Sequence, residues 1–249
     1  MIWYKSWLDT RWRFLIGLAI LLVMAVGVVF DYSLSAQLIA TAGRNPDAVT
    51  SSPLLREAIR IEQTYRGWVW YQWYRQNLAQ TGTLFAIVLG SRGLSVPREG
   101  LFTMSLPVSR MQWTRTRAAT GLGEFLVLAT VPSLAISFFS PMIGQHAAIT
   151  DVFAYGLCTF VAAAVFYSLA FLLSTVFPDA WRPLLLAVAI ACVLGILEAR
   201  FDFSGLFRVM SGHTYFESGS FPWIGLTSSA AVSVALLYGA AANIARKDF

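Results

Sequence analysis

The chain has 249 residues, of which 57% are apolar and only 12% are charged. Soluble domains carry about 25% charged residues, so this composition excludes an ordinary water-soluble fold and indicates a membrane protein. The formal net charge is +5, but the basic residues are scattered between apolar runs and form no continuous stripe. We therefore expect no nucleic acid among the partners of this chain.

Residues 1–13, MIWYKSWLDTRWR, predict an N-terminal amphipathic helix. At helical spacing, apolar and aromatic residues share one face and charged residues share the other. The two rows are Tyr4, Leu8 and Trp12, and Lys5, Asp9 and Arg13. Such a helix lies in the plane of the lipid headgroups, either as a simple anchor or as an elbow helix that also contacts a partner. Because no small-residue cleavage site follows, the next apolar run is expected to be a retained span.

Apolar runs of about 18 residues or more predict membrane-spanning helices. The expected fold is all-α, a single polytopic transmembrane domain over 1–249. It has six spans and an N-terminal interfacial helix. Membrane lipids are expected to contact the outer surface of the spans. The predicted spans are 14–38, 78–94, 116–140, 151–177, 183–199 and 223–245. The second and fifth are short enough that a buried or re-entrant helix is an alternative to a full crossing.

The positions of Lys and Arg predict the orientation in the membrane. With the N-terminus inside, eleven of the 18 basic residues fall in inner segments. These residues are Lys5, Arg11, Arg13, Arg92, Arg98, Arg110, Arg115, Arg117, Arg182, Arg246 and Lys247. Basic residues are enriched on the cytoplasmic side of membrane proteins. We therefore expect a multi-pass protein of a bacterial cytoplasmic (inner) membrane, with both termini in the cytoplasm.

Residues 39–77 form the largest predicted extracytoplasmic segment. Ser52 followed by Pro53 is a helix-start signal within it. The run WVWYQWYRQ at 68–76 clusters Trp and Tyr, which suit a membrane interface because each ring is apolar with one polar tip. We expect an amphipathic cap resting on the outer leaflet, with a substrate-entry or partner surface as the alternative.

The sequence contains few residues that could act in catalysis or bind a metal or cofactor. The sequence contains no Walker A, G-x-G-x-x-G or H-E-x-x-H motif and no paired-Cys pattern. His146 and His213 fall in two different predicted outer loops and are too few for a zinc site. Cys158 and Cys192 lie in apolar runs and are expected to be small buried side chains. We therefore expect no catalytic residue, no metal site and no cofactor in this chain.

Glu124 is the clearest ionisable residue inside a predicted span. It lies about two turns into the third span, roughly 12 Å along the axis. A charge at mid-bilayer costs roughly 2.5 to 3.5 kcal/mol on insertion scales. Glu124 is therefore a candidate bundle-interior carboxylate that pairs with a basic residue or gates a path. The alternative is a carboxylate satisfied in the inner headgroup zone beside Arg117 or Arg110.

Small residues recur every fourth position in the sixth predicted span. They are Ala231, Ala235, Gly239 and Asn243. Such a row favours close helix packing, either between subunits or within the chain. Asp31, Asp151 and Glu198 lie near outer span ends, where an interfacial position would satisfy their charges.

Residues 98–110, REGLFTMSLPVSR, form a polar and amphipathic interruption between two apolar runs. Its apolar residues share one helical face. Charged residues lie at both ends of the segment, Arg98 and Glu99 before the apolar residues and Arg110 after them. Pro107 ends that short helix, and a new helix is expected to begin at Arg110 and continue into the third span. The segment is thus either a stiff inward-facing bracket or a solvated loop whose charges obey the positive-inside bias.

The longer stretch REGLFTMSLPVSRMQWTRTRAATGLGEF, residues 98–125, resembles the segment after the second span of ABC type-2 permeases. These are the membrane subunits of ATP-driven exporters. In that family a Glu-containing helix precedes a stretch of the form LslPvsR and then the third span. Glu99, residues 106–110 and Glu124 match this pattern. The sequence departs from it where Leu101 follows Gly100, since relatives often carry a Gly-Thr pair there.

The resemblance implies a transmembrane permease subunit of an ATP-driven ABC exporter, not itself an enzyme. A separate ABC ATPase subunit would hold the ATP and Mg and dock on the cytoplasmic coupling segment 95–115, with help from the N-terminal helix. The coupling residues it implies are Arg98, Glu99, Phe102, Leu106, Pro107 and Arg110. A second permease chain, as a homodimer, would complete the translocation path. The alternatives are a mechanical or scaffold subunit of an ABC complex that moves no substrate, and a membrane-embedded lipid-modifying enzyme.

Overall fold

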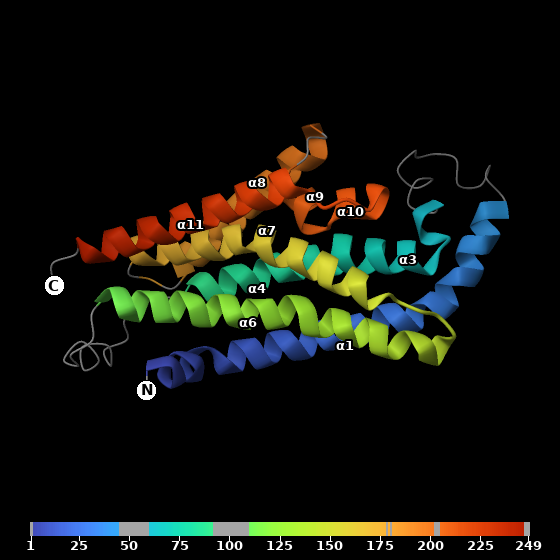
Figure 1. Cartoon of the computed structure of the whole chain (residues 1–249), viewed down its shortest axis with the longest axis horizontal. Helices are drawn as coiled ribbons and strands as arrows, with labels where there is room; N and C mark the ends of the chain where they lie inside the picture. Colours follow the sequence, from blue (N-terminus) through green and yellow to red (C-terminus); the bar gives the residue numbers. More distant parts are fainter. Residues whose placement is uncertain are drawn as a thin grey trace.

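A computed structural model of the chain describes residues 2–44, 60–91, 110–177, 179, 181–201 and 205–246. All the secondary structure in these ranges is helical, and the long helices run side by side along one axis (Figure 1). The all-α prediction is confirmed over these ranges. The helices are α1 (Ile2–Arg44), α3 (Tyr65–Trp68), η2 (Val69–Leu78), α4 (Ala79–Ser91), α6 (Arg110–Phe139), η3 (Ser140–Ile143), α7 (Ile149–Val176), α8 (Trp181–Phe201), α9 (Leu206–Met210), α10 (His213–Ser218) and α11 (Trp223–Ala245).

Within the described ranges, five helices are long and apolar enough to cross a membrane, as in a multi-pass membrane protein. They are Thr10–Ala36, Met111–Ile143, Ile149–Val176, Trp181–Phe201 and Trp223–Ala245. The predicted count of six spans is not confirmed. The second predicted span, 78–94, overlaps α4, which is not among the five.

The N-terminal residues belong to the same helix as the first span. Helix α1 runs for 43 residues, and no non-helical residue separates an interfacial part from a spanning part. A separate N-terminal interfacial helix is therefore not confirmed. The start of α1 is nevertheless two-sided, since Trp3, Tyr4 and Trp12 are exposed whereas Ser6 and Thr10 are buried.

Helices α3, η2 and α4 follow one another without a break and pass through the bundle, and we call this continuous run the central helix. The three tryptophans of the aromatic run 68–76 are buried within the protein, because Trp68, Trp70 and Trp73 are at most 6% exposed, and the expected position of the run at a membrane interface stays a prediction. Each indole N–H finds a protein acceptor inside the bundle at 2.9 Å. These acceptors are the carbonyl oxygens of Val28 and Ser211 and the hydroxyl oxygen of Ser133. The polar tips are thus satisfied by protein instead of by interfacial water.

Helix α7 is the most buried of the spanning helices and packs against α4, α6 and α11. Its alanines allow close approach, and Ala162, Ala163 and Ala170 are fully buried. On α4, a Cβ at Gly90 would lie closer than 3.0 Å to the backbone oxygen of Tyr167. Only glycine fits this contact without a shift of one helix.

Helix α8 is the least buried of the spanning helices. It meets the bundle through a narrow face that holds Pro183, Ala187 and Ala191. Cys158 on α7 is buried as predicted, whereas Cys192 on α8 is exposed. The prediction for Cys192 is wrong because its helix covers the bundle with only one side.

Helix α11 packs along α7. Asn243 Nδ2 donates a hydrogen bond to Thr175 Oγ1 at 2.8 Å, and a Cβ at Gly239 would be in ordinary contact with Leu172. Ala231 and Ala235 are exposed, so the row of small residues is split. Its C-terminal half makes an intrachain contact, and its N-terminal half faces outward.

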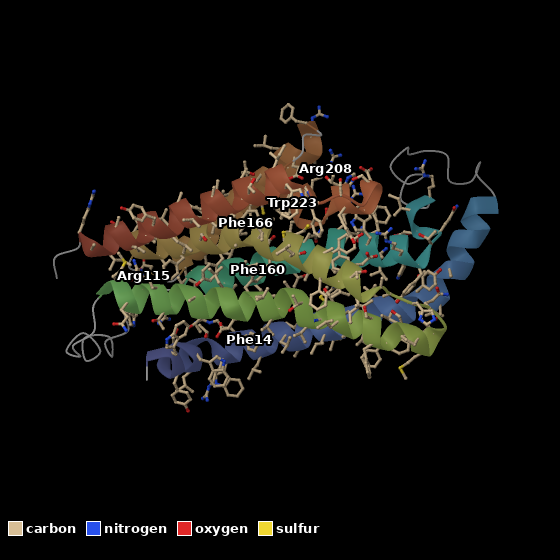
Figure 2. All side chains as sticks on the ribbon, in the orientation of Figure 1. Phe14, Arg115, Phe160, Phe166, Arg208 and Trp223 are labelled. Carbon is tan, nitrogen blue, oxygen red and sulfur yellow. The ribbon has the colours of Figure 1, made fainter. Side chains whose placement is uncertain are left out.

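The start of α1, the end of α4, the start of α6 and the end of α11 lie toward one end of the molecule, on the left of Figure 1. We call it the termini end. The opposite end, called the far end, carries α3, α10 and the connection from α6 to α7. In Figure 2 Arg115 lies toward the termini end, and Phe160 and Phe166 lie between the helices.

Candidate functional site

The predicted coupling segment joins a spanning helix directly. Arg98, Glu99, Phe102, Leu106 and Pro107 lie outside the described residues. The sixth predicted coupling residue, Arg110, is helical and is the first described residue of α6, and the predicted helix start stays a prediction. Helix α6 then continues for 30 residues and passes through Pro132. Any displacement of its first turn is therefore carried by one stiff element.

Glu124 lies in the interior of the bundle. It is 6% exposed, and one carboxylate oxygen, Oε1, accepts a hydrogen bond from the hydroxyl of Thr10 on α1. The positive charges of Arg117 and Arg13 also act on this carboxylate. Its second oxygen, Oε2, is buried without a hydrogen bond. Glu124 thus ties α6 to α1, while its role in gating a path stays a prediction.

Helix α7 contacts the same region of α6. The hydroxyl of Tyr167, a fully buried residue, donates toward the Ala118 carbonyl oxygen at 3.3 Å. Gly121 makes room for it, because a Cβ there would lie closer than 3.0 Å to the Tyr167 hydroxyl oxygen. The Glu124 region is therefore the place where polar contacts join α6 to α1 on one side and to α7 on the other.

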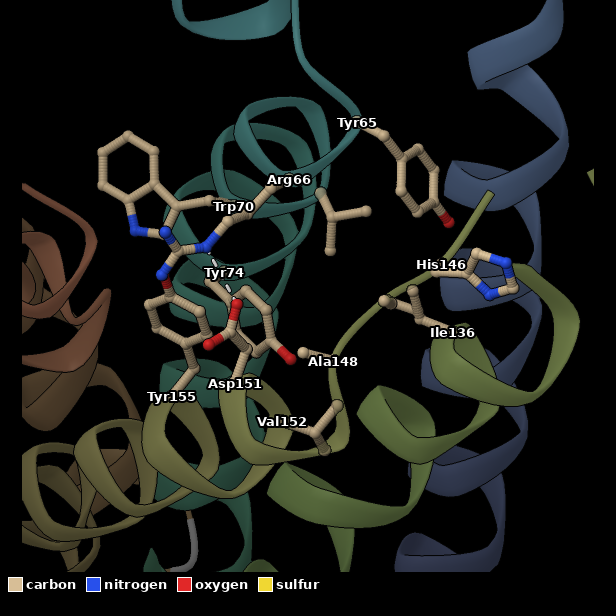
Figure 3. Close-up of a pocket in the computed structure, with 12 residues that line it drawn as sticks. Tyr65, Arg66, Trp70, Tyr74, Ile136, His146, Ala148, Asp151, Val152 and Tyr155 are labelled. Carbon is tan, nitrogen blue, oxygen red and sulfur yellow. Dashed lines mark hydrogen bonds and ion pairs between the residues drawn. The ribbon is translucent and has the colours of Figure 1, made fainter. Parts of the chain in front are cut away.

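A second group of polar side chains encloses a cavity of about 110 Å³ at the far end (Figure 3). Arg66 Nε on α3 donates to Asp151 Oδ2 on α7 at 2.9 Å. The Tyr215 hydroxyl on α10 donates to the other oxygen of Asp151 at 3.2 Å. One carboxylate thus connects three elements that are far apart in the sequence.

Aromatic rings surround the guanidinium of Arg66. Its Cζ lies 5.8 Å from the centre of the Phe216 ring, and Phe216 stacks on Trp70 with ring centres 4.2 Å apart. Figure 3 shows the guanidinium next to Trp70 and Tyr155, with a dashed line to Asp151. We call Asp151, Trp70, Tyr155 and Phe216 the Arg66 cage.

The cavity lies beside an unusual stretch of backbone. Helix η2 is π-helical over ten residues, and its side chains Val69, Trp70 and Tyr74 line the cavity. π-Helical turns are rare and occur frequently at functional sites. The five-residue hydrogen-bond spacing brings Val69 and Tyr74 to the same face, which lets both contact the cavity.

This site could not be predicted from the sequence, because its members are not neighbours in the chain. Asp151 was expected at the outer interface and Arg66 in an outer cap, and no local pattern links them. His146 lines the cavity, and His213 on α10 contacts Trp70 with ring centres 5.5 Å apart. Within the described part of the chain, no three His, Cys, Asp or Glu side chains come together as metal ligands.

Glu62 offers a test by pH near this end of the molecule. Burial raises the pKa of its carboxyl, which the hydrogen bond from Gln72 Nε2 at 2.7 Å opposes. Because the pKa of Glu62 is higher in the folded state than its ordinary value of 4.5, the contribution of this carboxyl to stability is fully present below pH 4.5. This contribution is lost as pH rises through the folded-state pKa. Glu62→Gln keeps an acceptor but cannot ionise. We expect it to raise the melting temperature at pH 7 and to have no effect at pH 4. An equal shift at both values would contradict this assignment.

Comparison with known protein families, with curated proteins and with solved structures gave no match to this chain.

Proposed function

We propose that the chain is the transmembrane permease subunit of an ATP-driven exporter in a bacterial cytoplasmic membrane. A separate ABC ATPase docks on the coupling segment 95–115, and a second copy of the chain completes the translocation path. The observation that supports the proposal is that residues 110–115 of the coupling segment belong to the spanning helix α6. The segment that resembles the coupling region of ABC type-2 permeases leads straight into a spanning helix.

The contacts of α6 support a mechanical role for this helix. At 1.5 Å per residue its 30 residues reach about 45 Å, enough to cross a bilayer core. Near its middle it is tied to α1 through Glu124, and at the far end it is tied to the central helix. There the Trp73 indole donates to Ser133 of α6, and Tyr65 shares a hydrogen bond of 2.6 Å with Ser140, the residue of η3 that directly follows α6. A displacement at its first turn would reach both neighbours.

The arrangement of the ends supports the proposed topology. The described parts of both terminal helices point toward the same end of the molecule as the end of α4 and the start of α6 (Figure 1). A coupling segment between α4 and α6 would therefore lie on the same side of the membrane as both termini. That side is the cytoplasm in the proposed orientation, where an ATPase finds ATP.

The contacts of Glu124 favour a permease over a lipid-modifying enzyme. Such an enzyme would bring acid, base and nucleophile side chains together at one face of the membrane. His146 lines the far-end cavity, whereas Glu124 contacts Thr10 on α1. These candidate groups do not share a site.

Purification of the tagged full chain from its native membrane tests the proposal. We expect a polypeptide with a Walker A motif to copurify with the wild-type chain. Glu99→Ala and Phe102→Ala should reduce its yield about tenfold, the loss expected when a docking residue worth roughly 1.4 kcal/mol is removed. The amount of chain in the membrane fraction should not change, since both side chains belong to the proposed docking segment and not to a span.

Arg182→Ala is the matched control, because Arg182 is exposed at the start of α8 and pairs with its sequence neighbour Asp179 at 3.0 Å. It removes a charge in another predicted cytoplasmic segment and should leave the ATPase yield unchanged. The proposal fails if the wild-type chain brings down no ATPase. It also fails if the Glu99 and Phe102 variants retain as much ATPase as the Arg182 variant.

A further inference from the structure

The Arg66 cage has the chemistry of a site for a positively charged organic group. Asp151 supplies a carboxylate that is largely buried, with 19% of its side chain exposed. The ring of Phe216 supplies a π face 5.8 Å from the guanidinium carbon, and Trp70 stacks behind Phe216. A carboxylate beside aromatic faces attracts organic cations, through the charge and through the ring quadrupoles.

The cavity next to the cage can hold a small chemical group. The cavity of about 110 Å³ is bounded by α3, η2, the end of α6 and the start of α7. An apolar cavity of about 150 Å³ is large enough for benzene in another protein, so this one suits a head group of roughly four or five non-hydrogen atoms. A guanidinium or a small alkylammonium has that size.

Arg66 already occupies the cage, but it is held loosely. Its side chain is 53% exposed, so the ion pair with Asp151 is half in solvent and is weak on the scale of exposed ion pairs. The side chain can therefore leave the cage at low cost. Tyr215 would still donate to Asp151, which keeps the carboxylate in place while the cation is exchanged.

We propose that the Arg66 cage is a binding site for a small organic monocation, and that the side chain of Arg66 occupies it as a tethered competitor when no ligand is bound. The π-helical segment η2 contributes Trp70 to the cage and, with Val69 and Tyr74, lines the adjoining cavity. An anionic ligand would face the carboxylate of Asp151, which disfavours it. The binding step needs no ATPase, so this proposal stands or falls separately from the proposed transport function.

Titration of the purified full chain with ethylguanidinium chloride tests the proposal. Binding is followed by the fluorescence of the tryptophans and by thermal stability, against sodium chloride at equal ionic strength. Arg66→Ala should bind the probe roughly tenfold more tightly than the wild type, since the competitor it removes is a half-exposed ion pair that also contacts the aromatic rings of the cage. The double variant Arg66→Ala with Asp151→Asn should lose this binding.

Arg75→Ala is the matched control. Arg75 lies on the same helical run, and its guanidinium carbon is 5.6 Å from the ring centre of Trp70 and 5.2 Å from that of Tyr71. Its removal should leave the affinity for the probe at the wild-type value. If Arg66→Ala does not fold, Arg66→Met replaces it in the same titration, because methionine keeps an aliphatic side chain without the charge.

Three results would overturn the proposal. The first is equal affinity in the wild type and in the Arg66 variants, because Arg66 would then not compete for the site. The second is binding that survives in the double variant, which would place the probe elsewhere. The third is a folded Arg66 variant that does not bind the probe at all.

Discussion

Thr10→Val is expected to destabilise the chain by about 1 to 3 kcal/mol, because it leaves a buried carboxylate without its hydrogen-bond donor. Valine has nearly the shape of threonine, so the packing between α1 and α6 should be kept. Glu124 is 6% exposed, and its other oxygen makes no hydrogen bond. The variant therefore deprives Glu124 of the hydrogen bond from α1 at a position where water does not readily replace it. The free energy of unfolding, measured by circular dichroism in mild detergent, checks the prediction.

Thr227→Val is the matched control for this experiment. Thr227 lies on α11, is exposed, and donates to carbonyl oxygens of its own helix, those of Trp223 at 2.8 Å and Ile224 at 3.2 Å. Loss of that bond should change stability by less than about 0.5 kcal/mol, as for most surface substitutions. An equal loss in Thr10→Val and Thr227→Val would mean that the bond between Thr10 and Glu124 contributes nothing.

The double variant Thr10→Val with Glu124→Leu separates the bond from the packing. Removing both partners of a buried hydrogen bond can be nearly neutral, whereas removing one is costly. We expect the double variant to be more stable than the sum of the two single losses predicts, by about 0.5 to 3 kcal/mol. Strict additivity would show that α1 and α6 are not coupled through this pair. Because Arg117 and Arg13 keep their charges, recovery should be incomplete.

The spanning helices could be predicted because each depends on a local pattern. An apolar run long enough to cross a bilayer has few alternatives, since the backbone must satisfy its own hydrogen bonds there. The helical conformation from Arg110 onward was predictable in the same way, because an apolar run long enough to cross a bilayer follows it. The path of the central helix was not predictable, because η2 carries Gln72, Arg75 and Gln76, and so polar a run does not indicate a helix inside the bundle.

The partners of polar residues could not be predicted, because they depend on contacts between distant parts of the chain. Depth in a span identified Glu124 as unusual, but its donor Thr10 lies 114 positions away in the sequence. The charges that are near it in sequence suggested Arg117 or Arg110 instead. The partners of Glu198, which was expected at a membrane interface, could not be predicted from the sequence either. It accepts hydrogen bonds from the backbone N–H groups of Phe207 and Arg208 at 2.9 and 2.6 Å.

The substitution Gly90→Ala should separate α4 from α7 and lower the melting temperature of the purified chain. The added Cβ would meet the backbone oxygen of Tyr167 closer than 3.0 Å, and it would also press on Ala170 at 3.1 Å. A backbone atom cannot rotate away as a side chain can, so one helix must move. Overpacking of this kind costs about 1 to 3 kcal/mol, or roughly 2 to 12 °C in a chain of this size. Differential scanning fluorimetry in detergent measures the shift.

Gly123→Ala is the matched control, because the same methyl group on α6 meets nothing within 4 Å. Alanine favours a helix over glycine by up to about 1 kcal/mol in water, so this variant should be unchanged or slightly more stable. The comparison isolates the contact between α4 and α7 from the intrinsic preference of the helix. If Gly90→Ala melts at the same temperature as Gly123→Ala, the two helices are not packed as closely as described, and the central helix has freedom to move against α7.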